Sequence, residues 1–160
     1  MQPKRIADSQ VSLTQMMGPQ DANILGNVHG GVIMKLVDEA GALAAMRHAQ
    51  NVVVTVAVDS MTFKKPIRIG DVVRIDARLT YVGRSAIEVR VDVIAEHPFQ
   101  PTAEHTNSAY IVYVALDPEG RPALSPACCW NRARKARWRE AESRQERRKA
   151  LRAQEKEHPQ

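Results

Sequence analysis

Apolar residues follow two different periods along the chain, and the period changes near residue 50. From Val32 to Met46, apolar side chains recur every three to four residues, which is the spacing of one face of an α-helix. Within this segment only Lys35, Asp38 and Glu39 carry charge. A helix that is apolar on most sides is buried on most sides, so the pattern predicts a long central helix with a sheet wrapped around it.

Beyond residue 50, β-branched and other apolar residues alternate with polar ones, which is the period of β-strands. Four strands are predicted there, joined by short turns rich in Gly, Pro and Asp, and one short strand is predicted before the helix. The predicted strands are Val11–Met17, Val52–Phe63, Val72–Val82, Ala86–Ala95 and Ala103–Leu116. A run of neighbouring strands with one helix predicts an α+β fold with a mostly antiparallel sheet.

The net charge of +5, from 23 basic and 18 acidic residues, is unevenly distributed. Residues 131–157 hold eleven Lys and Arg against five Glu, so the rest of the chain is close to neutral. We therefore predict one globular domain over residues 1–125 and a charged C-terminal tail over residues 126–160. The composition, 44% hydrophobic and 26% charged, is typical of a globular protein, and no apolar run is long enough for a membrane span.

The tail is rich in Ala, Arg, Glu, Gln and Lys, which favour helix, so a helix is predicted there. Arg144 and Arg148 lie one helical turn apart and are expected to repel each other. Trp130 and Trp138 are expected to anchor the helix, with the remainder in solvent. Contact with phosphates, RNA or an acidic membrane is the alternative. We favour the solvated helix because aromatic residues do not alternate with the basic ones.

The two cysteines, Cys128 and Cys129, are adjacent, and adjacent cysteines rarely bridge. Two reduced thiols are expected, and the spacing of Cys and His offers no metal site. The first nine residues lack the apolar stretch of a secretory signal. A cytoplasmic protein without a metal is therefore expected.

Two features indicate a reaction site. Asp38 interrupts the most apolar segment of the chain, so it is either a functional carboxylate or a group on an aqueous face of the helix. A polar loop that ends in Gly30 and Gly31 leads into the same helix, and amide groups at a helix N-terminus favour a developing negative oxygen. Asn23 and His29 of this loop are either turn residues or site residues. The combination, with a carboxylate about two helical turns further on, favours a site.

Three residue patterns occur in order over residues 10–120. The first is Asn23-x-x-Gly26-x-x-His29-Gly30-Gly31-x-x-Met34-x-x-x-Asp38-Glu39-Ala40. The second is Val53-Val54-Thr55-Val56-Ala57-Val58-Asp59-Ser60-Met61-x-Phe63-x-x-Pro66-Ile67-x-x-Gly70-Asp71. The third is Val82-Gly83-Arg84-Ser85, followed by an alternating strand. Together they resemble the hotdog-fold acyl-CoA thioesterases, specifically the cytosolic acyl-CoA hydrolase group.

The resemblance implies hydrolysis of fatty or short-chain acyl-CoA to free CoA and a carboxylic acid. It implies that Asn23 and Asp38 form the active site from opposite subunits, so that a dimer, or a hexamer built from three dimers, is expected. Asp38 is expected to act as general base or as nucleophile, and these two roles stay open. The Gly31 N–H, together with the Gly30 N–H, is expected to stabilise the oxyanion. Asn23 is expected to hold the water or the carbonyl, and His29 to position the loop.

The resemblance also implies where CoA binds. The pantetheine amides are expected along the backbone of Val56, Ala57 and Val58, and the nucleotide end at the turn Gly83-Arg84-Ser85-Ala86. No cofactor is expected, since CoA is part of the substrate, and nucleic acid is not expected as a partner. A hydroxyacyl-thioester dehydratase and a non-catalytic acyl-CoA-binding regulator stay open as alternatives, as does nucleic-acid binding through the tail.

Overall fold

The structure is a computed structural model that describes residues 4–100, 102–126, 139–148 and 150 and the backbone of residues 128–129. In chain order the strands are β1 (Lys4–Arg5), β2 (Val11–Met16), β3 (Val53–Phe63), β4 (Val72–Val82), β5 (Ala86–Glu96), β6 (Ala103–Ala115) and β7 (Cys128–Cys129). The helices are the 3-10 turns η1 (Ile6–Ser9) and η2 (Pro19–Asp21), the long α1 (Gly30–Ala49) and a C-terminal helix over residues 139–148.

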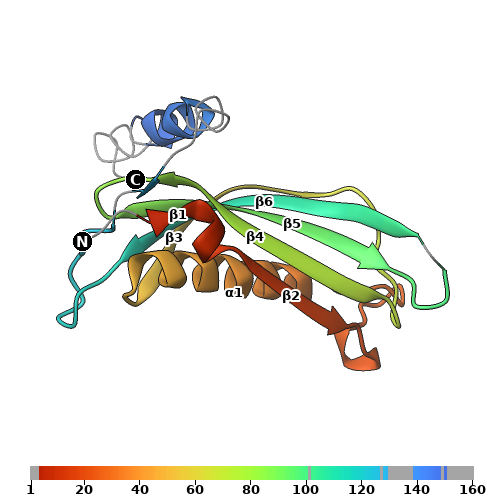
Figure 1. Ribbon diagram of the computed structural model, residues 1–160. Helices are drawn as coiled ribbons and strands as arrows, with labels where there is room; N and C mark the ends of the chain where they lie inside the picture. Colours follow the sequence, from red (N-terminus) through yellow and green to blue (C-terminus); the bar gives the residue numbers. More distant parts are fainter. Residues whose placement is uncertain (1–3, 101, 127, 130–138, 149, 151–160) are drawn as a thin grey trace.

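Five strands form one antiparallel sheet in the order β2-β4-β5-β6-β3. α1 lies against one face of this sheet and the C-terminal helix against the other (Figure 1). We call these the inner and the outer face. The prediction of an α+β hotdog fold is confirmed, and the predicted strands agree with the observed ones within one residue at either end. β3 lies at an edge of the sheet, where only β6 pairs with it among the described strands.

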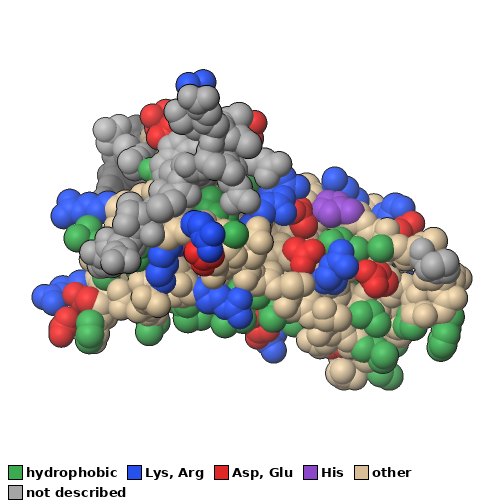
Figure 2. All heavy atoms as spheres, in the orientation of Figure 1, with side chains coloured by type: hydrophobic (Ala, Val, Ile, Leu, Met, Phe, Trp, Pro, Cys, Tyr) green, Lys and Arg blue, Asp and Glu red, His purple; other side chains and the backbone are tan. Residues whose placement is uncertain are grey.

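α1 is longer than predicted because both of its ends are capped. The His29 imidazole accepts a hydrogen bond from the Gly31 N–H at the N-terminus, and Gln50 ends the helix in the left-handed conformation with φ 54°. The prediction that the helix is buried on most sides is confirmed except along one exposed stripe, at Gly31, Met34, Lys35, Glu39, Leu43 and Arg47. On this stripe, Met34 and Leu43 are 47% and 40% exposed. Hydrophobic side chains accordingly gather along the α1 side of the surface in Figure 2.

The inner-facing residues of the strands form the core with α1. The alternation of β5 sends Ile87, Val89 and Val91 toward the helix, and all three are fully buried. The intervening residues of β5 point to the outer face, where Glu88 is also fully buried. A buried carboxylate needs charged or polar partners, and here the C-terminal helix supplies them.

The C-terminal helix is predicted correctly as a helix, but its surroundings differ from the prediction. Arg144 and Arg148, expected to repel each other in solvent, each donate to Glu88 at 2.7 Å. The shared carboxylate between the two guanidinium groups outweighs their mutual repulsion. Ala141 of the same helix is fully buried. The anchoring predicted for residues 130–138 lies outside the described residues.

The beginning of the chain is tied to the segment that follows β6. β1 pairs in parallel with β7, with Lys4 opposite Cys128. The buried His48 contacts the Ser9 hydroxyl at 3.3 Å and the Pro126 carbonyl oxygen at 2.8 Å. Burial lowers the pKa of His48, so the ring is held neutral.

Within the described part of the chain, no helix is long and apolar enough to cross a membrane.

Candidate active site

The Asp38 side chain lies between α1 and the inner face of the sheet, where two hydroxyl groups hold it. The Thr55 hydroxyl of β3 donates to Asp38 Oδ1 at 2.7 Å, and the Tyr113 hydroxyl of β6 lies 3.1 Å from the same oxygen. The Tyr113 hydroxyl also lies 3.0 Å from the Asp38 carbonyl oxygen. Within the described residues no partner is found for Asp38 Oδ2. The carboxylate is thus fixed through one oxygen and open at the other.

Tyr113 is fully buried beneath α1. Burial and the neighbouring Asp38 carboxylate raise the pKa of Tyr113, so the phenol stays protonated and acts as a donor. The hydroxyl reaches Asp38 only because residue 41 is Gly, since a Cβ there would clash with the Tyr113 hydroxyl. The missing side chain at Gly41 therefore leaves the space in which the Tyr113 hydroxyl contacts the Asp38 carboxylate.

Sequence reasoning identified Asp38 but missed Thr55 and Tyr113. One signal was available for Tyr113. It follows the inner-facing register of its strand, and a buried tyrosine hydroxyl needs a partner. Gly41, three residues after Asp38, marks the same face of the helix. Thr55 carries no comparable signal, because Thr is an ordinary strand residue.

The loop before α1 is organised by Asn23. Its Oδ1 accepts hydrogen bonds from the Leu25 and Asn27 N–H groups at 2.9 and 3.2 Å, and its own N–H donates to the Asn27 carbonyl oxygen at 2.7 Å. Gly26 completes the turn with φ +78°, a conformation that favours glycine. The Asn23 side-chain oxygen is therefore engaged within the loop, which leaves its NH₂ group for other contacts.

His29 is the N-cap of α1, and its Nδ1 accepts a hydrogen bond from the Gly31 N–H at 2.9 Å. The Gly31 amide, expected to face an oxyanion, is available to a ligand only when the His29 ring releases it. Among the described residues, no acceptor is found for the Gly30 N–H. This amide points from the helix N-terminus without competition and is the better donor in this conformation.

A cavity of about 260 Å³ adjoins this helix N-terminus. Its lining includes Asn23, Gly30, Phe63 and Asn107, and it does not include Asp38. Asp38 lies eight residues further along α1, about 12 Å along the helix axis. It contacts the Thr55 end of β3, whereas the cavity adjoins the Phe63 end, eight strand residues or about 26 Å away. One chain therefore does not bring Asn23 and Asp38 together.

The residues expected to bind CoA lie on two segments at the Thr55 end of the sheet. Val56, Ala57 and Val58 belong to the edge strand β3, and Val58 is 49% exposed. The turn from Gly83 to Ala86 joins β4 and β5 and is closed by a 2.7 Å hydrogen bond from the Gly83 N–H to the Ala86 carbonyl oxygen.

The register of the sheet places this turn near the start of β3. Ala86 is opposite Val114 of β6, and Val114 is opposite Val54 of β3. The Arg84 side chain is exposed. Its carbonyl oxygen accepts a hydrogen bond from the Ser125 N–H at 2.8 Å, which ties the turn to the chain after β6.

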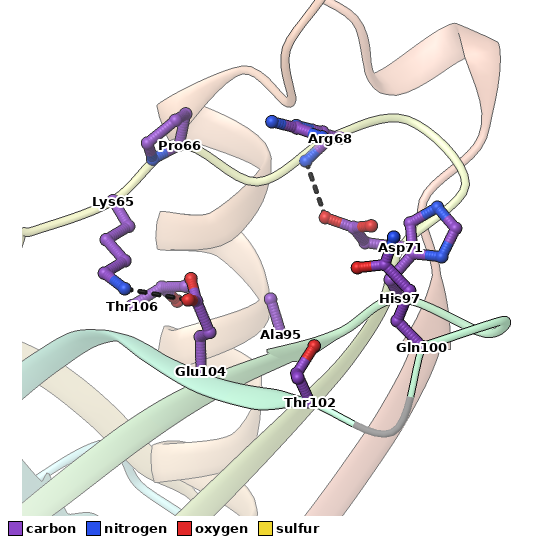
Figure 3. A pocket seen from close by; sticks show the side chains of 10 residues that line it. All are labelled: Lys65, Pro66, Arg68, Asp71, Ala95, His97, Gln100, Thr102, Glu104 and Thr106. Carbon is purple, nitrogen blue, oxygen red and sulfur yellow. Dashed lines mark hydrogen bonds and ion pairs between the residues drawn. The ribbon is translucent and has the colours of Figure 1, made fainter.

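A second cavity, of about 290 Å³, adjoins the first, with which it shares Lys65 and Pro66 (Figure 3). Lys65 and Glu104 pair there at 2.8 Å, and the Arg68 N–H donates to Asp71 at 2.9 Å. None of the predicted site residues lines this cavity. In the part of the chain that the structure describes, no three His, Cys, Asp or Glu side chains gather as a metal site.

Comparison with known proteins finds relatives of the chain both in sequence and in structure. Residues 25–100 match the model of the thioesterase superfamily. The acyl-CoA thioester hydrolase YciA of Escherichia coli is 34% identical over 125 residues, which are 76% of this chain and 94% of that protein. The chain also matches the cytosolic acyl coenzyme A thioester hydrolases of rat, mouse and human, and spans 33% of their length.

Solved structures agree with these relatives. An acyl-CoA hydrolase of Staphylococcus aureus, in complex with butyryl coenzyme A, coenzyme A and coenzyme A disulfide, superposes with a TM-score of 0.86 at 35% identity, over 96% of this chain and 94% of that one. The hexameric thioesterase of Yersinia pestis gives a TM-score of 0.68 at 38% identity, over 72% of this chain and 93% of that one.

Proposed function

We propose that this chain, which belongs to the thioesterase superfamily and within it to the acyl-CoA thioester hydrolases, hydrolyses fatty or short-chain acyl-CoA to CoA and a carboxylic acid. The observation that carries the proposal is the Asp38 carboxylate, held through Oδ1 by Thr55 and Tyr113. A carboxylate with one fixed and one open oxygen is suited to general-base hydrolysis. The reaction needs no cofactor in this proposal. A cytoplasmic location is supported by the cytosolic mammalian relatives.

Asp38 Oδ2 takes a proton from water, and the resulting hydroxide attacks the carbonyl carbon of the thioester. The carbonyl π electrons move to oxygen, and the tetrahedral intermediate then expels the CoA thiolate as the carbon–sulfur bond breaks. The proton held by Asp38 passes to the thiolate, so the carboxylate is regenerated. Thr55 and Tyr113 keep the base in one orientation, which lowers the cost of placing it against water.

The helix N-terminus supplies the second half of the site. We propose that the Gly30 N–H, and the Gly31 N–H once His29 releases it, donate to the oxyanion. Asn23 orients the water or the thioester carbonyl with its free NH₂ group. His29 keeps its capping role and thereby sets the position of the loop.

Because one chain separates the two halves, we propose that a second copy completes the site. β3 is an edge strand, and exposed apolar side chains flank it: Val52, Val54, Val58, Phe63, Met34 and Leu43. Antiparallel pairing of two β3 strands about their middle brings the Asn23 loop of one copy to the Asp38 end of the other. The hexameric relative from Y. pestis supports a dimer, or a hexamer of three dimers, as the assembly.

CoA lies along the Thr55 end of the sheet in this proposal. The pantetheine amides lie along the backbone of Val56, Ala57 and Val58, where two β-bulges make the strand irregular and leave room for contacts besides those to the partner's β3. The turn from Gly83 to Ala86 receives the nucleotide end, and the exposed Arg84 faces a phosphate. The butyryl-CoA and CoA complexes of the S. aureus relative support this class of ligand.

The activity is tested with a panel of acyl-CoA substrates from acetyl to palmitoyl and detection of the free thiol. Release of thiol from at least one substrate by the unaltered protein is expected. Absence of hydrolysis across the panel, with retained CoA binding, identifies a non-catalytic binding protein instead.

The shared site is tested by mixing Asp38→Asn and Asn23→Ala proteins. Each variant alone is expected to be inactive, whereas a mixed dimer holds one complete site. Random exchange of subunits is expected to restore about a quarter of the unaltered activity, since half of the dimers are mixed and each has one working site of two. Refolding or dissociation before mixing, compared with simple mixing, is the control. No recovery after subunit exchange contradicts a site shared between copies.

A further inference from the structure

We propose that the C-terminal helix over residues 139–148 is a clamp that holds the edge strand β3 in the shape required for acyl-CoA binding, with Arg148 as its positioning residue. The identity of the ligand rests on the proposed function. The clamp itself rests on contacts on the outer face of the sheet, away from the Asp38 carboxylate.

Arg148 bridges two carboxylates on different strands. Its Nη1 lies 2.9 Å from Asp59 Oδ2 of β3, and its Nη2 lies 2.7 Å from Glu88 Oε2 of β5. The Arg148 side chain is only 12% exposed, and Glu88 is not exposed at all. Ion pairs that are withdrawn from water interact more strongly than those at the surface, and losing one partner is costly.

Asp59 lies where β3 is weakest. The pairing of β3 with β6 shifts register between Thr55 and Ala57 and again between Val58 and Ser60, so Val56 and Asp59 are bulge residues. A bulge interrupts the ladder of hydrogen bonds, and within one chain β3 has no second neighbouring strand to compensate. Within the described residues, the pair with Arg148 is the only ion pair of Asp59. Charge attraction, without a hydrogen bond from Arg148 Nη1, therefore draws the second bulge toward the C-terminal helix.

The other end of the clamp is anchored on the centre of the sheet. Glu88 also accepts hydrogen bonds from Arg144 at 2.7 Å and from the Thr80 hydroxyl of β4 at 2.7 Å. The Arg144 guanidinium lies 4.2 Å from the centre of the Tyr110 ring of β6. The helix is thus fastened to β4, β5 and β6, and through Arg148 it holds β3 relative to them.

The position of the bulge connects the clamp to binding. Asp59 directly follows Val56, Ala57 and Val58, along whose backbone the pantetheine amides are proposed to lie. Arg148 approaches from the outer face, whereas Asp38 lies on the inner face. Arg148 therefore acts on the substrate through the shape of β3 alone, and its loss is expected to weaken binding more than it slows the chemical step.

The test compares Asp59→Asn, Arg148→Gln and the double variant in the full-length protein. Arg147→Gln is the matched control, because it removes the same charge from an exposed neighbour on the same helix. With the acyl-CoA that the unaltered protein hydrolyses best, each single variant is expected to raise KM by about fivefold or more and to change kcat by less than about twofold. The double variant is expected to match a single variant rather than the product of both, and the control is expected to be unchanged.

Asp59→Asn keeps the proposal falsifiable where Arg148→Gln fails to fold, because it is the smaller substitution and Arg148 keeps its ion pair with Glu88. An unchanged KM in Asp59→Asn, or effects of the two variants that simply multiply, overturns the clamp. Hydrogen exchange of the β3 amides is measured on the same proteins. Faster exchange in Asp59→Asn and Arg148→Gln, but not in Arg147→Gln, supports the clamp even if no acyl-CoA is hydrolysed. Unchanged exchange overturns it, so its failure and that of the proposed function are distinguishable.

Discussion

The inner and outer faces of the sheet each hold a carboxylate, Asp38 half-buried and Glu88 fully buried, and the two are held in opposite ways. Asp38 receives neutral hydroxyl donors on one oxygen only. Glu88 receives two guanidinium groups and a hydroxyl, which engage both of its oxygens. Burial alone would raise the pKa of Glu88, but the hydrogen bonds from Arg144, Arg148 and Thr80 lower it. Glu88 thus has partners on both oxygens, whereas Asp38 has partners on one oxygen only among the described residues, as the proposed role of general base requires.

This comparison is tested most directly by removing each carboxylate in turn and measuring both stability and activity. Glu88→Ala is expected to lower the free energy of unfolding by about 3–5 kcal/mol, because two partly buried guanidinium groups lose their common partner. Asp38→Asn is expected to lower kcat by about 10²- to 10⁴-fold while changing the free energy of unfolding by less than about 1 kcal/mol. Urea unfolding and thiol release measure the two effects. A large loss of stability in Asp38→Asn would contradict the division of roles.

The hydroxyl groups at Asp38 sharpen the comparison at a smaller scale. Tyr113→Phe removes one donor and is expected to lower kcat by about tenfold, since a hydrogen bond to a charged group is worth about 1.5–3 kcal/mol. Gly41→Ala is expected to act in the same direction, because the added Cβ displaces the Tyr113 hydroxyl. Tyr110→Phe, which removes a phenol hydroxyl from the outer face of the same strand, is the control. Equal losses in Tyr110→Phe and Tyr113→Phe would argue against a positioning role.

The smallest expected effect concerns pH. His48 has a pKa below its ordinary value of 6.5, so below that value the unfolded chain takes up a proton that the folded protein excludes. Stability is therefore expected to fall as pH drops through 6.5 toward the folded pKa. The lowered pKa of Glu88 makes stability depend on pH only below about pH 4.5, its ordinary value, where that stability is lost as pH falls. Urea midpoints at about pH 7.5 and about pH 5.5 measure the first window, and His48→Gln is expected to flatten the slope. An unchanged slope in that variant assigns the pH dependence to other groups.

The elements were predictable because the periods of the chain are clear. The alternation of Val and Ile in β5 and the helical spacing of α1 each fit one structure well, so their positions follow from local pattern. Asp38 was identifiable for the same reason, since a carboxylate in an apolar helix breaks the pattern. The roles of Asp38, Asn23, His29, Gly31 and the CoA-binding residues stay predictions.

The partners of these residues were not predictable, because they come from distant parts of the chain. Tyr113 lies 75 positions after Asp38, and Arg148 lies 60 positions after Glu88. The expectation of repulsion between Arg144 and Arg148 treated the helix as isolated, which is the reference state for such pairs. When Glu88 lies opposite Arg144 and Arg148, its negative charge attracts both guanidinium groups. Local spacing carries no information about such a third group.

The distance along the chain between Glu88 and its arginines also sets an order of events during synthesis. All five strands of the main sheet leave the ribosome before residues 144 and 148. Until then the outer face around Glu88 is not covered by the C-terminal helix, and β1 has no β7 to pair with. Contacts that join remote positions form late because loop closure comes first. The inner core can therefore form before the outer face is covered, since residues 139–148 follow all five strands of the sheet in the chain.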